Sequence, residues 1–140
     1  FAWIITVSGL AAIIGESMLA ITDNVLLLLL ILNIVLLIIG MFLDAGPAIL
    51  VLGPVLGPMF IDLGIHPMHF AVVMCVNVTV GLATPPMGLV LFVSAEVSKE
   101  RVETIAWQML PFLAIEILVI FLITYFPALS LALPRLLGFV

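Results

Sequence analysis

The chain has 140 residues, of which 66% are hydrophobic and only 8% are charged, and its formal net charge is −5. Water-soluble domains carry about a quarter charged residues, so this composition excludes an ordinary soluble fold. The three basic residues of the sequence make no patch for nucleic acid or for anionic lipid, and a bilayer is the expected environment.

The fold class follows from how a backbone is satisfied in lipid. Amide groups in hydrocarbon must be paired within a helix or in a closed barrel. Barrel strands alternate in polarity over about ten residues, whereas the run from Leu26 to Leu32 is apolar throughout. About 20 apolar residues span the hydrocarbon, so the length leaves room for about five or six membrane segments. We therefore predict an all-α polytopic membrane protein.

Residues 1–24 are predicted to be the end of a transmembrane helix followed by a connector. The chain opens at Phe1 inside an apolar stretch, without Met and without a basic leader, so we expect a piece of a longer protein rather than a signal peptide. The apolar stretch reaches Ile14, and Thr22-Asp23-Asn24 then supplies side chains suited to capping the start of the next helix.

Residues 25–63 are predicted to form two apolar helical arms. The first covers Val25–Leu43, and Asp44-Ala45-Gly46-Pro47 ends it, because Gly frees the backbone and Pro suits the first turn of a new helix. The second arm contains Gly53-Pro54 and Gly57-Pro58, in which the glycine spacing is typical of closely approaching membrane helices. From the residues alone, the two arms form either a re-entrant hairpin or two full crossings.

Residues 64–98 are predicted to form a broken transmembrane helix. After a short loop, Met68–Ala83 is helical, Thr84-Pro85-Pro86 interrupts it, and Met87–Val97 resumes. At 1.5 Å per residue, a segment of about 30 residues is too long for one straight crossing. Two half-helices that meet inside the membrane fit the sequence better.

Residues 99–140 are predicted to contain a charged loop, a last transmembrane helix over Ile105–Phe126, and a tail that follows Pro127. Lys99 and Arg101 lie in the most charged stretch, so the positive-inside rule assigns this loop to the cytoplasm. The hairpin ends and the tail then face the opposite side.

The helix break is the first candidate site. Broken helices in transporters expose carbonyl groups that coordinate cations and N-termini that face anions. Asn77, Gly81 and Thr84 are spaced by four and three residues and share one helix face. The structural alternative is that Gly81 serves close packing, that Thr84 bonds back to its own helix, and that the prolines are a plain kink.

Other polar residues have equally plain alternatives. Asp44 is either a helix N-cap or a functional intramembrane carboxylate. Glu116 lies within the last helix and is interpreted as a polar contact to another helix rather than a transport residue. His66 and His69 are separated by Pro67 without a further ligand nearby, so no transition-metal site is predicted. Hydrolase and P-loop signatures are absent from the sequence, and no enzyme is expected.

An ordered series of motifs carries a family resemblance. It runs from Gly40-Met41-Phe42-Leu43-Asp44 through Gly64-Ile65-His66-Pro67-Met68-His69-Phe70 to Gly81-Leu82-Ala83-Thr84-Pro85-Pro86-Met87-Gly88, and it ends with Pro127-Ala128-Leu129-Ser130-Leu131-Ala132-Leu133-Pro134. This series resembles the C-terminal part of the large membrane subunit of tripartite ATP-independent periplasmic (TRAP) transporters.

The resemblance implies a sodium-coupled secondary transporter of the bacterial cytoplasmic membrane, which imports organic acids such as C4-dicarboxylates or sialic acid. A periplasmic binding protein delivers the substrate and a small membrane subunit completes the complex. The fold implied is an elevator-type transporter with two inverted repeats. Residues 25–63 would be the re-entrant hairpin of the second repeat, and residues 64–98 its broken helix.

The resemblance also implies a sodium ion between hairpin and broken helix, bound mostly through backbone oxygens of Gly40, Gly81, Thr84 and Met87. Asp44 and Asn77 are expected in or near the substrate site. Sodium is a hard cation that prefers oxygen, and carbonyl groups can replace its hydration shell. The alternatives from other classes are an intramembrane enzyme that uses Asp44 or the two histidines, and a structural subunit without a site of its own.

Overall fold

The computed structural model describes residues 13, 16–17, 20, 22 and 24–138, and these residues form helices and short connections. The named helices are α3 (Val25–Phe42), α4 (Ala45–Asp62), α5 (Pro67–Gly81), α6 (Leu89–Ser98), α7 (Val102–Tyr125) and α8 (Pro127–Leu136). Among them, α3, α4 and α7 are long and apolar enough to cross a membrane. The predicted helical membrane protein is confirmed, whereas the prediction for residues 1–24 falls almost wholly outside the described residues.

Helix α3 begins where the sequence predicts it. The side chain of Asn24 accepts a hydrogen bond of 3.0 Å from the backbone amide of Leu26, which satisfies one of the free amides of the first turn. The helix ends at Phe42, and a turn at Leu43 and Asp44 leads directly into α4. The break is shorter than predicted, because Gly46 and Pro47, expected in the turn, already lie in the first turn of α4.

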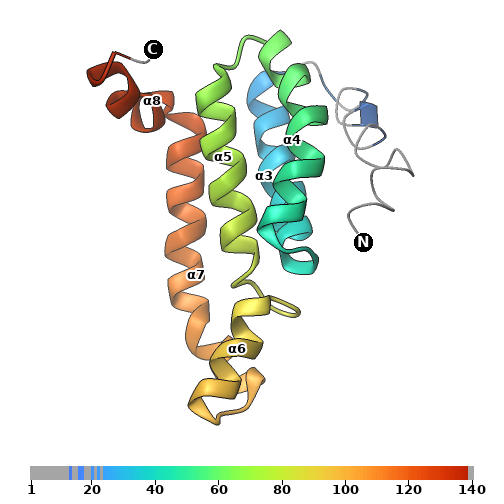
Figure 1. Cartoon of the computed structure of the whole chain (residues 1–140), viewed down its shortest axis with the longest axis vertical. Coiled ribbons are helices and arrows are strands. Elements are labelled where there is room, and N and C mark those ends of the chain that lie inside the picture. The colour runs from blue at the N-terminus through green and yellow to red at the C-terminus, as the bar shows by residue number, and fades with distance from the viewer. Residues whose placement is uncertain (1–12, 14–15, 18–19, 21, 23, 139–140) are drawn as a thin grey trace.

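Helices α3, α4 and α5 pack together as one unit (Figure 1). Helix α4 continues through Pro54 and Pro58, so these residues do not divide it. Helix α5 contacts α3 and α4 along its length. The buried side chains that join the three helices include Leu28, Leu32, Leu36, Leu52, Leu56, Phe60, Val73, Met74 and Val78. In lipid, such packing stabilises through van der Waals contact rather than through removal of surface from water.

The break after α5 is longer than predicted. The sequence places the resumption of the helix at Met87, but α6 starts at Leu89. Two backbone hydrogen bonds explain the difference, because the amide of Gly88 donates to the carbonyl of Thr84 at 3.1 Å and that of Val90 donates to Leu82 at 3.1 Å. These bonds turn the chain within the break, so that Met87 belongs to the connection and not to the helix.

The charged loop is shorter than predicted. Only residues 99–101 separate α6 from α7, and Glu103 lies in the first turn of α7, where a carboxylate interacts favourably with the helix dipole. Helix α7 exposes large apolar side chains, namely Trp107, Leu110, Phe112, Ile115, Leu118, Val119 and Leu122. An apolar surface of this extent fits lipid or further protein. After Pro127 the predicted tail is helical, as α8.

Replacing Lys99 with glycine is expected to stabilise the α6–α7 junction by about 0.5–1 kcal/mol. Lys99 has a φ of 59°, in the left-handed region that only glycine adopts without penalty. The exposed ion pair between Lys99 and Glu96, 3.2 Å apart, would be lost, but it contributes little. Thermal unfolding in detergent measures the change. Glu96→Gln is the control, since it removes the pair alone; a lower midpoint for Lys99→Gly than for this control would contradict the prediction.

Candidate functional site

Helices α3 and α5 approach each other closely at Gly40 of α3 and Gly81 of α5. A Cβ atom placed on Gly81 would lie 2.7 Å from the Cα of Gly40 and 2.8 Å from the carbonyl oxygen of Leu37. A Cβ atom on Gly40 would lie 2.5 Å from the carbonyl oxygen of Val78. Neither position therefore accepts a side chain. The structure brings together two of the four residues predicted to bind sodium.

Gly40, at the crossing, and Met87, in the α5–α6 connection, carry carbonyl groups without backbone partners among the described residues. The amide of Leu43 bonds to Ile39, and among the described residues no recorded hydrogen bond reaches the carbonyl of Gly40. The same holds for Met87, because the amides of Val90 and Leu91 bond elsewhere. The α3–α4 turn and the α5–α6 break lie at the same end of the three-helix unit (Figure 1). Free carbonyl oxygens at such a position are suitable cation ligands.

The side chain of Thr84 bonds back to its own helix. Its hydroxyl donates to the carbonyl of Val80 at 2.9 Å, as the structural alternative predicts. A hydroxyl has one proton but two lone pairs, so the oxygen of Thr84 can still coordinate a cation while this bond is made. Met87, in contrast, exposes 54% of its surface, and its thioether is a poor ligand for sodium. Its backbone oxygen is the better candidate.

Asp44 is the N-cap of α4. Its carboxylate accepts a hydrogen bond of 2.8 Å from the amide of Ala45 and is exposed to the surroundings at the tip of the hairpin. The capping alternative for this residue is thus what the structure shows. The exposed position also leaves the second carboxylate oxygen available to a ligand that reaches the tip.

Asn77 lies in a buried polar cluster that the sequence reasoning missed. Its amide nitrogen donates to Oδ1 of Asn33 at 2.8 Å and to the carbonyl of Val73 at 2.7 Å, and Thr124 donates to the same Oδ1 at 3.1 Å. Asn33 and Asn77 are at most 1% exposed, and among the residues that the structure describes Nδ2 of Asn33 and Oδ1 of Asn77 have no hydrogen-bond partner. The isolated Asn33 in an otherwise apolar helix was the available signal.

The remaining polar candidates divide between caps and buried groups. His66 caps α5, because its Nδ1 accepts from the amide of Met68 at 3.2 Å. His69 is buried at the α5–α7–α8 junction, where it contacts Ser130 and Thr124. Glu116 is partly buried, and its Oε2 has no recorded partner. In the part of the chain that the structure describes, no group of three His, Cys, Asp or Glu side chains could hold a metal ion.

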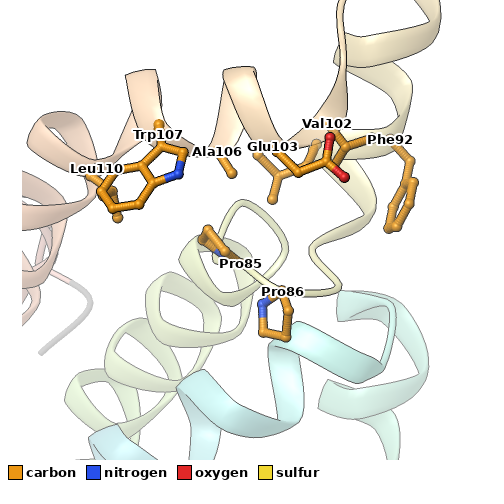
Figure 2. A pocket seen from close by; sticks show the side chains of 9 residues that line it. Pro85, Pro86, Phe92, Val102, Glu103, Ala106, Trp107 and Leu110 are labelled. Atoms are coloured by element: carbon orange, nitrogen blue, oxygen red, sulfur yellow. The ribbon is translucent and has the colours of Figure 1, made fainter.

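A cavity of about 580 Å³ adjoins the break (Figure 2). Pro85 and Pro86 form one wall, and side chains of α6 and α7 form the other, including Phe92 and Trp107. The wall is mainly apolar, and Glu103 supplies the carboxylate shown in Figure 2. The break therefore borders an open space as well as the α3–α5 contact.

Comparison with known families decides the assignment. Residues 1–129 match the family model described as "Tripartite ATP-independent periplasmic transporter, DctM component". The chain belongs to the DctM family. This confirms the resemblance carried by the motifs between Gly40 and Gly88.

Several DctM-family relatives are similar over most of the chain. It is 44% identical over 110 residues to the C4-dicarboxylate TRAP transporter large permease protein DctM of Pseudomonas aeruginosa, which covers 79% of this chain and 26% of the relative. It is 37% identical over 136 residues to the sialic acid TRAP transporter large permease protein SiaM of Vibrio cholerae. This match covers 97% of this chain and 32% of the relative. It is 39% identical over 134 residues to the uncharacterized protein YgiK of Salmonella typhimurium. This match covers 96% of this chain and 31% of the relative.

The chain thus spans between about a fifth and a third of the length of these and similar relatives, from 21% to 32%. Its family and its long apolar helices make it a multi-pass membrane protein.

Proposed function

We propose that the chain forms part of the large membrane subunit of a sodium-coupled importer of organic acids in the bacterial cytoplasmic membrane. The observation that carries the proposal is the contact between Gly40 and Gly81, close to the ends of both helices. A Cβ atom added to Gly40 would lie 3.0 Å from the Cα of Gly81. In this proposal, α3 and α4 are the re-entrant hairpin and α5 and α6 the broken helix of the second inverted repeat of an elevator-type transporter.

The coupling ion is assigned to the oxygens around the crossing. Gly40 and Met87 offer carbonyl groups free of recorded hydrogen bonds, and Thr84 offers its hydroxyl oxygen. The carbonyl of Gly81 accepts from the amide of Thr84 at 2.9 Å and keeps a second lone pair. Neutral oxygen ligands of this kind bind an alkali cation weakly enough to release it during a transport cycle.

The substrate and partners follow from what the relatives are named to carry. A C4-dicarboxylate or a sialic-acid-like anion is proposed, since relatives with these printed names match most of the chain. A periplasmic binding protein would deliver it, and a small membrane subunit and lipid would cover the apolar surface of α7. Asp44 is proposed to lie near the substrate, whereas Asn77 is proposed to position the broken helix, because it is fully buried.

Replacing Thr84 with alanine is expected to raise the sodium concentration for half-maximal uptake by about tenfold, equivalent to about 1.4 kcal/mol. The hydroxyl oxygen would be lost as a ligand while the carbonyl remained. The measurement is substrate uptake at graded sodium concentrations, with the complete permease, its small subunit and the binding protein in proteoliposomes.

Thr79→Ala is the matched control for this variant. Thr79 makes the same bond to its own helix, to Cys75 at 2.7 Å, but its side chain is exposed. Its removal should leave the sodium dependence unchanged. If both variants behave alike, the hydroxyl of Thr84 is a local helix bond and no ligand, and this part of the proposed sodium site is wrong.

A further inference from the structure

A second polar centre lies at the end of the bundle opposite the break, where α5 begins and where α7 turns into α8 (Figure 1). His69 of α5 is 2% exposed. Its Nε2 lies 3.1 Å from the carbonyl oxygen of Thr124, and its Nδ1 lies 2.6 Å from Oγ of Ser130. One ring thereby connects three helices.

The number of protons in this cluster determines which of its contacts are hydrogen bonds. The carbonyl of Thr124 can only accept, so Nε2 of His69 carries a proton. Oγ of Ser130 lies within hydrogen-bond distance of two acceptors when the ring is neutral, because the carbonyl of Pro127 is 3.0 Å away. A single hydroxyl proton serves only one of them. The neutral ring therefore leaves one of these contacts without a proton.

Adding one proton to the ring satisfies all of them. Nδ1–H then donates to Oγ of Ser130, and the hydroxyl proton of Ser130 turns to the carbonyl of Pro127, while Nε2–H stays on Thr124. The positive ring also lies at the last carbonyls of α7, where the negative end of a helix dipole favours a cation. No other atom needs to move.

Access to water comes from a partly open cavity of about 300 Å³. It is lined by the start of α3, the α4–α5 connection and the end of α7, and His66, His69 and Tyr125 are the titratable residues among its walls. Tyr125 is engaged, since its hydroxyl donates to the carbonyl of Leu26 at 3.1 Å. The proton can enter and leave along this cavity.

The helices packed against α5 carry few titratable side chains. Of the helices packed against α5, α3 carries no titratable residue and α4 carries Asp62, exposed at its end. Helices α7 and α8 carry Glu103, Glu116, Tyr125 and Arg135. Like charges repel, so a positive charge on His66, which lines the same cavity, opposes one on His69.

From these contacts we infer that His69 is a proton-binding site that latches α5 to the α7–α8 corner. Taking up a proton from water completes the chain of hydrogen bonds from Thr124 to Pro127 and tightens the joint. When the proton is released, the hydroxyl of Ser130 donates to Nδ1 of His69 again, and the carbonyl of Pro127 loses its hydrogen bond from Ser130. The ligand is a proton, and nothing in the proposed sodium site takes part.

The test is a pH titration of ¹⁵N-labelled histidines by NMR in the complete permease, and it requires no transport. A resonance that disappears in His69→Gln should change from one neutral tautomer to the doubly protonated ring as the pH is lowered. Ser130→Ala should lower its proton affinity by about threefold to tenfold, because a hydrogen bond from a charged donor is stronger than one to a neutral ring. His66→Gln removes the opposing charge, so His69 must still titrate, at the same or a higher pH.

A second readout reports on the joint itself. Spin labels on Cys75, exposed on α5, and on Leu133→Cys, exposed on α8, give a distance distribution between the two helices. The distribution should narrow as the pH falls, and His69→Gln should abolish the change. A His69 resonance that does not titrate, a Ser130→Ala variant with unchanged proton affinity, or a distribution independent of pH would each overturn the inference, whether or not the permease couples to sodium.

Discussion

Replacing Gly81 with alanine is expected to lower the free energy of unfolding of the permease by about 1–3 kcal/mol and to abolish uptake. The added Cβ would lie 2.7 Å and 2.8 Å from backbone atoms of α3. Backbone atoms cannot rotate away, so the two helices must separate, and the carbonyl groups around the crossing move with them. Thermal unfolding in detergent and uptake in proteoliposomes measure the two effects.

Gly53→Ala in α4 is the matched control. A Cβ there would meet only the flexible side chain of Met74, at 3.8 Å, which is an ordinary contact. Since alanine is favoured over glycine within a helix by about 0.5–1 kcal/mol, this variant should be as stable as the wild type or more so. Equal stability losses at Gly53 and Gly81 would show that the α3–α5 contact is not as close as described.

The buried amide pair of Asn33 and Asn77 should behave as a coupled unit. Asn77→Leu alone removes the donor to Asn33 Oδ1 and is expected to cost about 1–3 kcal/mol, because a buried acceptor loses a partner. Asn33→Leu alone should cost a similar amount, since it also deprives Thr124 of its acceptor. Replacing both residues with leucine should lower the stability by less than the sum of the two single losses, since neither amide is then left without its partner.

Unfolding of the two single variants and the double variant, measured under the same conditions, gives the coupling energy as a double-mutant cycle. Additive losses would mean that the two amides do not depend on one another. The wild-type pair already leaves Nδ2 of Asn33 and Oδ1 of Asn77 unpaired, so the double variant also removes two buried polar atoms that the native protein does not satisfy.

Local signals predicted most helix ends. The caps at Asn24 and Asp44 and the proline after Phe126 each act through residues within one turn, so the sequence reveals them directly. The start of α6 was misplaced because it depends on the bonds of Gly88 and Val90 to carbonyls in the break. Which carbonyl a turn selects is not a property of any single residue.

Contacts between distant segments could not be predicted from spacing. Asn33 lies 44 residues from Asn77 and 91 from Thr124, and only the packing of α3, α5 and α7 brings them together. The spacing of the glycine pair in α4 predicted a close contact, but a Cβ added to Gly57 or Gly53 would meet only side chains, at 3.6 Å and 3.8 Å. The close contact between Gly40 and Gly81 was not predicted, since nothing in their separation identifies them as partners; the family resemblance named them only as sodium-binding residues.

The caps of α3, α4 and α5 have a consequence for biosynthesis. Asn24, Asp44 and His66 each bond to an amide one or two residues further along, so each helix start is complete as soon as its own first turn has left the ribosome. The hairpin tip therefore needs no later segment in order to form. The polar contacts to Thr124 and Ser130, in contrast, can form only after α7 and α8 have been synthesised, so they form later than the three caps.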